Sequence, residues 1–408
     1  MLRRVVDSET AESRRAMAVK LAAKLELDEW LAAMREFGDF EDFEPGVRRY
    51  EPTLGVLGKQ TPVELFVYVP EKYSTETPAP LLVVGHGTGG TGRGQHEPWK
   101  AAADELGLLV LSPSATGANV GYTFSEEERA ETLAALRWVR RRFNVDENRI
   151  ALTGVSRGGH LTWDLATRHP DRFSLLAPMI GGPRLSNSRG ENTIRYVENV
   201  AHLPIRDLQG SRDDPHLLFN LRLAFGRLES FDAPDAKLIE FPELGHSYNH
   251  HAVDWRTHLE SSRREACPTR VVRCAARLDE ARSAWVEITK FGKDVSEKFQ
   301  LRVAARKWQA MSDQEQREAM QDAADERTAR IEMRRLDVGS FEGEGDRVKA
   351  FRLLLDRSMF EAGKPVSVRF NRRVKKVRVK ESREVLLKDF AERFDRTFLP
   401  VAEALVKG

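Results

Sequence analysis

Apolar and charged positions change their spacing twice along the chain and so divide it into three stretches. In residues 8–37, apolar side chains return at roughly helical intervals among charged ones, which predicts two helices. From residue 49 to about residue 241, short apolar runs alternate with helical stretches. Strands are expected there at 50–55, 63–69, 80–85, 108–112, 149–154, 175–180, 203–208 and 236–241, the first two as a hairpin, and helices at 125–143, 161–168 and 215–228. This alternation predicts an α/β fold with a mostly parallel sheet and helices on both faces.

The alternation ends near residue 259, and strand-like segments dominate the remaining sequence. Two helices interrupt these strands. One begins at Ser312, which forms a capping box with Glu315, and the other covers residues 382–394. Strands are expected at 284–288, 299–304, 348–355, 366–370 and 374–379, with Asn371 and Arg372 as a hairpin turn. We therefore expect three units: a helical N-terminal extension at 1–48, an α/β domain at 49–261, and a strand-rich C-terminal accessory domain at 262–408.

Composition and charge narrow the classes of partner. Hydrophobic residues make up 41% of the chain and charged residues 31%, as in ordinary soluble globular proteins. The 65 Lys and Arg residues nearly balance the 63 Asp and Glu residues, so no overall field favours nucleic acid or an anionic membrane. No apolar stretch approaches the roughly 20 residues that span a bilayer, and no signal peptide is visible. A cytoplasmic location is the default expectation, with a periplasmic or secreted one if a leader was removed; the oligomeric state stays open.

The two cysteines, Cys267 and Cys274, are too few for a disulfide scaffold or a structural zinc site. They could pair with each other across a short loop. Two free thiols are the favoured interpretation, because nothing else in the sequence indicates an oxidising compartment.

Ser156 stands in the motif Gly154-Val155-Ser156-Arg157-Gly158, between a predicted strand and a predicted helix. The pattern Gly-x-Ser-x-Gly is weak alone, but this context is that of a nucleophile elbow. Gly154 and Gly158 leave room for the strained turn. The sequence therefore predicts a serine nucleophile; the alternative is a glycine-rich turn that holds an inert serine.

A glycine-rich loop, Gly85-His86-Gly87-Thr88-Gly89-Gly90, follows the buried strand at 80–85. Glycines let backbone N–H groups approach a developing oxyanion. We expect Thr88 or Gly87 to supply one donor and the N–H of Arg157 to supply the other. A phosphate-binding loop is the weaker interpretation, since no Gly-Lys-Ser/Thr follows, and His86 is expected to be structural.

His246 lies in the loop just after the last apolar strand of the α/β region, at 236–241, where a catalytic base is expected. A metal site with His250, four residues on, is possible, but no accompanying metalloprotease pattern supports it. For the acid, the strand at 203–208 leads into a loop with Asp213 and Asp214. Asp213 is the first choice and Asp214 the reserve. The order Ser156, Asp213, His246 is that of α/β-hydrolases.

With these motifs in place, residues 50–259 resemble the α/β-hydrolase superfamily, close to its esterase D, polyhydroxybutyrate-depolymerase-like and dienelactone-hydrolase-like group. The resemblance covers about half of the chain. Besides the motifs above, it is carried by Phe143-Asn144-Val145-Asp146-Glu147-Asn148-Arg149-Ile150 and His169-Pro170-Asp171-Arg172-Phe173. Gln209 departs from the family pattern, which commonly has a histidine before the glycine of the acid loop.

The resemblance implies hydrolysis of small or polymeric carboxylic esters through an acyl-enzyme, with no metal or organic cofactor. One alternative is a serine peptidase of the prolyl-oligopeptidase type. Another is a glycan- or partner-binding protein with an inert hydrolase core. The acyl and alcohol groups of the substrate cannot be predicted from residue spacing.

Overall fold

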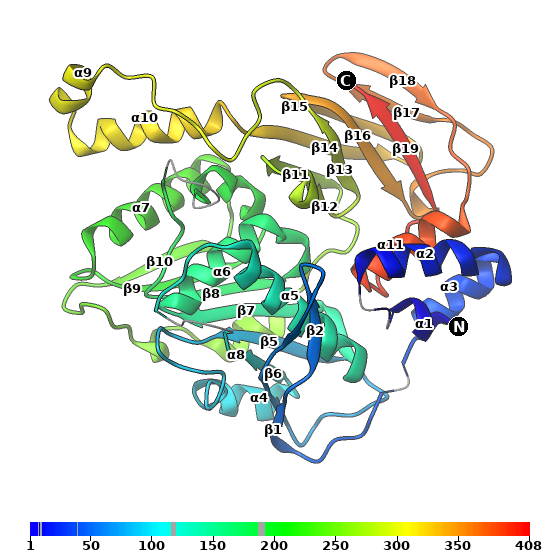
Figure 1. Ribbon diagram of the computed structural model, residues 1–408, viewed down its shortest axis with the longest axis horizontal. Coiled ribbons are helices and arrows are strands. Elements are labelled where there is room, and N and C mark those ends of the chain that lie inside the picture. The colour runs from blue at the N-terminus through cyan, green and yellow to red at the C-terminus, as the bar shows by residue number, and fades with distance from the viewer. Residues whose placement is uncertain (7, 9, 39, 116–119, 187–191) are drawn as a thin grey trace.

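The computed structural model describes the chain apart from residues 7, 9, 39, 116–119 and 187–191 (Figure 1). Its largest sheet has eight strands, in the spatial order β1 (Gly46–Tyr50), β4 (Leu65–Val69), β6 (Leu109–Pro113), β5 (Ala79–Gly85), β7 (Val145–Val155), β8 (Leu175–Met179), β9 (Ile205–Gly210) and β10 (Ala236–Phe241). The six strands from β6 to β10 in this order run parallel, whereas β4 is antiparallel to both of its neighbours. The predicted α/β fold with a mostly parallel sheet is confirmed.

Helices cover both faces of this sheet (Figure 1). Their bounds are α4 (Lys100–Leu106), α5 (Glu126–Arg142), α6 (Arg157–Arg168), α7 (Pro215–Ser230) and α8 (Trp255–Ser261). Consecutive residues of β5 show the two-sided burial, because Leu81 belongs to the core under α5 and α6 while Leu82 belongs to the core under α4 and α8. A strand buried on both faces reads as a continuous apolar run, which is why this half of the fold is visible in the sequence.

The expected hairpin near residue 50 is more elaborate than predicted. Strand β1 ends at Tyr50, which pairs with Leu65 at the start of β4. Between them, β2 (Thr53–Val56) and β3 (Lys59–Pro62) form a separate two-stranded ribbon. The predicted strand at 50–55 is therefore divided between two sheets.

The C-terminal part contains two further sheets. One has the order β11 (Arg270–Ala275), β14 (Ala329–Asp337), β15 (Ser340–Asp346), β17 (Val366–Phe370) and β18 (Arg373–Val377). The other has the order β12 (Arg282–Ser283), β13 (Val286–Phe291), β16 (Val348–Leu355) and β19 (Ala402–Lys407). The helices of this part are α9 (Ala305–Ala310), α10 (Asp313–Asp325) and α11 (Arg383–Arg393). The strand-rich character predicted after residue 259 is confirmed.

One predicted strand of this part is wrong, and one predicted turn is confirmed. Residues 299–304 have no regular structure and lead into α9, because no neighbouring strand pairs with them. Asn371 and Arg372 have φ angles of 45° and 68° and join β17 to β18. Two successive residues with positive φ are the mark of a tight hairpin turn. Ser312 and Glu315 form the expected capping box of α10.

The N-terminal helices α1 (Leu2–Val6), α2 (Ala11–Leu21) and α3 (Leu27–Arg35) pack on the C-terminal part. Trp30 lies in one hydrophobic core with Phe390 of α11. Figure 1 shows α2 and α11 side by side although they stand near opposite ends of the chain. The first and the last segments thus enclose a shared core, and the α/β unit is inserted between them.

Short 3-10 helices complete the secondary structure, at Ala22–Lys24, Glu97–Trp99, Pro170–Arg172, Ile194–Val200, His250–Ala252, Leu278–Glu280 and Arg357–Met359.

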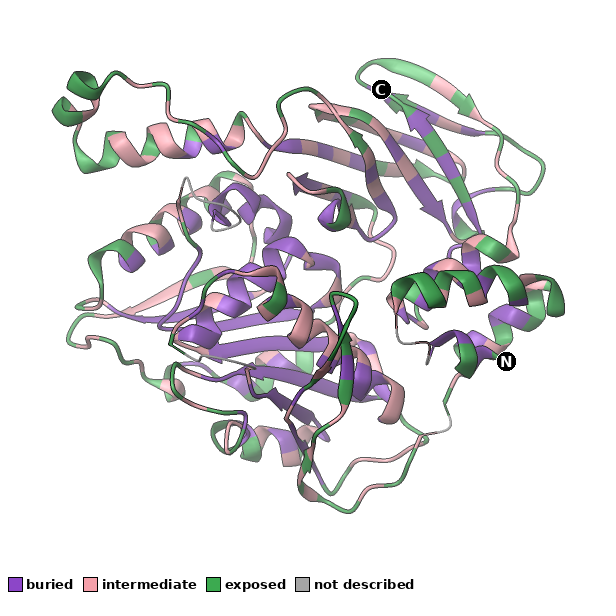
Figure 2. Ribbon diagram, viewed as in Figure 1, coloured by how far each residue is buried: buried purple, intermediate pink, exposed green. Residues whose placement is uncertain are grey.

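Figure 2 shows buried strands through the central sheet and a largely exposed surface on α9. No helix in the described part of the chain is both long and apolar enough for a membrane span.

Candidate active site

Ser156 occupies the turn between β7 and α6. Its φ and ψ angles are 56° and −109°, a backbone conformation that residues other than glycine rarely adopt. Two backbone hydrogen bonds fix it: the Ser156 N–H donates to the Met179 carbonyl at 2.8 Å, and the His160 N–H donates to the Ser156 carbonyl at 3.1 Å. The strained turn is therefore held by both neighbouring elements.

The glycines of the motif allow close approach of three backbone segments. A Cβ atom at Gly154 would lie 2.4 Å from the carbonyl of Gly158, and one at Gly158 would lie 2.1 Å from the carbonyl of Gly85. Both distances are too short for any side chain. The requirement for glycine on each side of Ser156, predicted from the motif, is confirmed.

The structure brings Ser156, His246 and Asp213 into one hydrogen-bonded chain. His246 Nε2 lies 2.9 Å from Ser156 Oγ, and His246 Nδ1 lies 2.8 Å from Asp213 Oδ2. His246 follows β10 and Asp213 follows β9, so the ends of adjacent parallel strands place them. The His246 side chain is 52% exposed and that of Asp213 only 8%, so the imidazole is open to solvent while its carboxylate partner is shielded.

Asp213 is surrounded by donors. Besides His246, Gln209 Nε2 donates to Oδ2 at 2.8 Å, and the backbone N–H of Asp214 donates to Oδ1 at 2.8 Å. Burial tends to raise the pKa of Asp213, but the Asp214 N–H, the Gln209 amide and His246 outweigh it and hold this pKa below its usual value. The carboxylate is thus ionised and oriented at neutral pH.

Asp214, the reserve choice for the acid, lies apart from the imidazole. Its side chain accepts a hydrogen bond from the His216 N–H at 2.9 Å and caps the N-terminus of α7. Of the two neighbouring aspartates, only Asp213 contacts His246 among the described residues.

Gln209 is the residue of this site that the sequence reasoning misjudged. The sequence marks it only as a departure from a family pattern. In the structure its side-chain amide donates a hydrogen bond to Asp213, and it is fully buried at the end of β9. A buried glutamine four residues before the predicted acid was the available signal, because a buried amide requires hydrogen-bond partners.

The predicted oxyanion donors lie around the elbow. Arg157 is the first residue of α6, so its N–H is one of the first-turn amides that have no acceptor within the helix. Gly87 lies against the elbow, since a Cβ atom there would be 3.7 Å from the Val155 carbonyl. Thr88 follows it in the same loop. Donation by Thr88, Gly87 and Arg157 stays a prediction.

Two side chains brace this region. The Arg157 guanidinium turns to Glu128, with Nη2 and Oε1 2.6 Å apart, and only 6% of its side chain is exposed. His86 Nε2 accepts from the Ala115 N–H at 2.9 Å, and Nδ1 lies 2.8 Å from the Gly87 carbonyl. Burial lowers the pKa of His86, so the neutral ring can donate from Nδ1 and accept at Nε2. This geometry supports the structural role expected for His86.

The metal site considered for His246 and His250 has no counterpart. His250 packs against Trp99 and Trp255, with ring centroids 4.9 Å and 5.7 Å away. Within the described residues, no group of three potential metal ligands is found. Cys267 and Cys274 are both free thiols, as favoured from the sequence.

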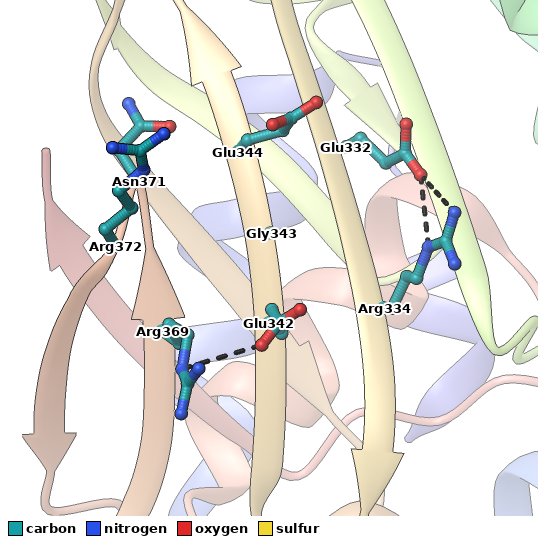
Figure 3. Close-up of a pocket in the computed structure, with 8 residues that line it drawn as sticks. All are labelled: Glu332, Arg334, Glu342, Gly343, Glu344, Arg369, Asn371 and Arg372. Atoms are coloured by element: carbon teal, nitrogen blue, oxygen red, sulfur yellow. Dashed lines mark hydrogen bonds and ion pairs between the residues drawn. The ribbon is translucent and has the colours of Figure 1, made fainter.

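A hollow of about 600 Å³ lies on the five-stranded C-terminal sheet, away from the triad (Figure 3). Its charged side chains pair with one another: Glu332 with Arg334 along β14 at 3.0 Å, and Glu342 of β15 with Arg369 of the neighbouring β17 at 3.5 Å. The hollow is therefore lined by three glutamates and three arginines, whose charges cancel.

A family model and a curated relative match part of the chain. Residues 123–212, which include the elbow, match the family model described as "Prolyl oligopeptidase family". A feruloyl esterase B from Neurospora crassa is 26% identical over 132 residues, which is 30% of this chain and 44% of that protein. The chain thus spans less than half the length of this relative.

The solved structures that match this chain cover about half of it. An acetyl xylan esterase from Aspergillus awamori has 15% identity and a TM-score of 0.41, over 52% of this chain and 99% of that one. An S-formylglutathione hydrolase from Agrobacterium tumefaciens has 20% identity and a TM-score of 0.42, over 54% and 97%. A thermostable esterase has 20% identity and a TM-score of 0.40, over 53% and 63%.

Proposed function

We propose that this protein is a serine hydrolase whose inserted α/β unit cleaves carboxylic esters through an acyl-enzyme on Ser156. The observation that carries the proposal is the continuous chain from Ser156 Oγ through His246 to Asp213, with contacts of 2.9 Å and 2.8 Å. A serine with an adjacent base and an oriented third group is the arrangement that activates a hydroxyl.

The proposed reaction uses these groups in two steps. His246 Nε2 takes the proton of Ser156 Oγ as the oxygen attacks the ester carbonyl carbon. The resulting oxyanion accepts hydrogen bonds from the N–H of Arg157 and that of Thr88 or Gly87. When the tetrahedral intermediate collapses, the C–O bond to the alcohol breaks and the alcohol leaves with the proton from His246.

The second step returns the enzyme to its starting state. A water molecule gives a proton to His246 Nε2 and attacks the acyl carbon. The bond from that carbon to Ser156 Oγ then breaks, Oγ recovers the proton, and a carboxylic acid is released. Asp213 keeps the Nδ1–H of His246 in place through both steps and stabilises the imidazolium.

For the substrate class, the named relatives suggest where to begin. The matched relative is called a feruloyl esterase and one structural neighbour an acetyl xylan esterase. We propose phenolic esters and acetylated sugars as the first substrates to assay. A series of p-nitrophenyl esters of rising acyl length comes next, because a narrow pocket and an open groove give opposite length profiles.

A serine peptidase remains the second candidate, because the family model that matches residues 123–212 is that of prolyl oligopeptidases. Such peptidases usually carry a large domain that restricts access to the site. Here the C-terminal part consists instead of a five-stranded and a four-stranded sheet. Measuring kcat/KM for a peptide p-nitroanilide and a p-nitrophenyl ester separates the two, and a higher value for the anilide would favour the peptidase.

The decisive experiment is labelling of the full chain with a fluorophosphonate probe followed by peptide mapping. We expect the adduct on Ser156, no labelling of Ser156→Ala, and wild-type labelling of Ser230→Ala, a control on exposed α7. Ser156→Ala should retain only the residual activity that binding and the oxyanion donors supply. An adduct elsewhere, or none, would refute the proposal and favour an inert core.

A further inference from the structure

A hairpin at the outer rim of the C-terminal part carries a surplus of positive charge. Residues 362–380, which include β17 and β18, contain eight lysines and arginines and no aspartate or glutamate. The whole chain has a formal net charge of only +2, so the rest of it is negative overall. Figure 1 shows β18, the orange edge strand of its sheet, away from the α/β unit. The hairpin is therefore a local positive field that the overall charge balance conceals.

Several of these cations lie on one side of the chain at β18. Val377 and Val379 pack against the hydrophobic core. Lys376, Arg378 and Lys380 alternate with them and are exposed. Because successive side chains of an extended segment point to opposite sides, these three cations share the outer side.

Two arginines continue this row toward the hairpin turn. Arg369 of β17 is paired in register with Val374 of β18, which lies on the same outer side and is 57% exposed. Arg372 lies in the turn, and both arginines line the hollow on the five-stranded sheet (Figure 3). We call Arg369, Arg372, Lys376, Arg378 and Lys380 the basic stripe. At roughly 3.4 Å per residue, the segment from Arg372 to Lys380 is up to about 27 Å long.

The positive charge of the basic stripe is not balanced by the protein. Within the described residues, four of the five stripe cations form no ion pair, and the fifth, Arg369, has only a long one with Glu342, at 3.5 Å. The other acids nearby already have partners: Glu361 with Lys364 at 2.5 Å, Glu381 with Arg357 at 2.7 Å, and Glu344 with Arg330 at 3.9 Å. Like charges held in one row repel each other, so the stripe favours an external anion.

Protection of an exposed strand edge explains only part of this pattern. Charged residues on an edge strand discourage pairing with another sheet. The basic stripe, however, continues past the end of β18 at Val377 to Arg378 and Lys380, and it includes Arg369 of β17, a strand with neighbours on both sides. These three cations do not shield the edge of β18.

We propose that the basic stripe binds a linear acidic polysaccharide, whose uronate carboxylates pair with its arginines and lysines. A guanidinium can bind a carboxylate through two parallel hydrogen bonds, which suits the three arginines of the stripe. The adjoining hollow of about 600 Å³ has room for sugar rings. Its carboxylate, amide and guanidinium groups can form hydrogen bonds with sugar hydroxyls.

Two features of this surface favour such a polymer over other polyanions. Residues 371–380 contain no aromatic side chain, so the stripe lacks the rings on which proteins stack the bases of single-stranded nucleic acids. Glu332, Glu342 and Glu344 lie beside the stripe on the same sheet (Figure 3), and a flat anionic membrane would meet their charges as well. A narrow polymer can keep its carboxylates on the stripe alone.

Binding at the basic stripe would hold the protein on a polymer and so raise the concentration of the polymer's esters near Ser156. Only this consequence rests on the proposed ester hydrolysis. The binding itself is independent of it.

The test is fluorescence anisotropy of labelled oligogalacturonate titrated with the full chain. We expect saturable binding that weakens as the salt concentration rises and that unlabelled polygalacturonate reverses, whereas neutral dextran does not. Ser156→Ala should bind as the wild type does, which separates this proposal from the proposed reaction. No saturable binding at low salt would overturn the proposal. Tighter binding of DNA or of phosphatidylglycerol vesicles than of oligogalacturonate would overturn the ligand class.

A triple variant locates the site. The combination of Lys376→Gln, Arg378→Gln and Lys380→Gln should weaken oligogalacturonate binding by about 10- to 100-fold, because three exposed ion pairs with the ligand are lost. Circular dichroism establishes that the variant is folded. Arg378→Gln alone, with an expected weakening of about two- to fivefold, serves if the triple variant does not fold.

A second triple variant controls for net charge. Lys20→Gln, Lys59→Gln and Lys237→Gln together remove the same charge from exposed positions on α2, β3 and β10. This control should bind oligogalacturonate as the wild type does. Equal affinities of the two triple variants would mean that the stripe is not the binding site and would refute the assignment.

Discussion

Replacing Asp213 by asparagine isolates the contribution of the carboxylate to the proposed reaction. The two side chains have nearly the same shape, but asparagine has no charge and only one acceptor oxygen. In the wild type, Oδ2 accepts from His246 and from Gln209, and Oδ1 accepts from the Asp214 N–H. An amide at this position must therefore turn an N–H group toward one of these three donors.

The magnitude follows from the 2.8 Å contact between Asp213 and His246. When the imidazolium forms, opposite charges about 4 Å apart attract by roughly 4 kcal/mol at an effective dielectric constant near 20. Loss of that attraction corresponds to about a 10³-fold decrease in kcat. Loss of the correct tautomer as well brings the decrease to about 10⁴-fold, the effect of the same substitution in a Ser-His-Asp protease.

The assay is steady-state hydrolysis of a p-nitrophenyl ester, with Asp214→Asn as the matched control. Asparagine caps helices as well as aspartate does, so this control should keep near wild-type kcat and Tm. Circular dichroism establishes that Asp213→Asn is folded. A kcat of Asp213→Asn within tenfold of the wild type, or a large loss in Asp214→Asn, would refute the assignment of Asp213 as the acid.

Three further predictions concern neighbouring or buried groups. Gln209→Leu should lower kcat about tenfold with little change in KM, because Asp213 loses a donor; an unchanged kcat in ester hydrolysis would contradict this. Burial raises the pKa of Asp207 well above its usual value, so the folded protein keeps a proton that the unfolded chain releases, and stability is lost as pH rises above about 4. Asp207→Asn should therefore raise the free energy of unfolding in urea at pH 7 by more than about 1 kcal/mol and have no effect near pH 4; equal stabilities at pH 7 would exclude a protonated Asp207. Burial raises the pKa of Cys267 to about 11 and that of Cys274 also upward, so both thiols should react slowly with a disulfide reagent at pH 8 and both should titrate after unfolding, whereas fewer than two would indicate a disulfide.

The α/β half could be predicted from the sequence because its constraints are local. Every residue of β5 is buried, which leaves a run of apolar letters that few other structures explain. The elbow requires glycine at 154 and 158 because a side chain at either position would meet backbone atoms. Parallel strand ends then bring the following loops together, which is enough to expect Ser156, His246 and one of two aspartates at one site.

The C-terminal half was harder to predict because strand formation depends on partners distant in sequence. Strand β14 was not expected: its buried face carries Ala329, Ile331 and Met333, and charged residues alternate with them. Residues 299–304 have a similar alternation but no partner, and they are not a strand. Local alternation alone cannot separate these two cases.

Within the site, the choice between Asp213 and Asp214 lay beyond the sequence because it depends on the orientation of one turn. The same turn that aims Asp213 at the imidazole leaves Asp214 at the start of α7. A shift of one residue would exchange these roles. The spacing of residues along the chain does not determine which of the two side chains this turn directs toward His246.

The shared core of the N-terminal helices and the C-terminal sheets has a consequence for the order of folding. Trp30 leaves the ribosome long before Phe390, its companion in that core, so the first helices must wait for most of the chain to be made. Closing an unstructured loop of about 230 residues, from the end of α3 at Arg35 to the start of β11 at Arg270, costs roughly 5 kcal/mol of chain entropy. Folding of the inserted domain during synthesis would remove much of that cost by bringing its two ends together. We therefore expect the inserted domain to fold first and to act as the template on which the two ends of the chain assemble.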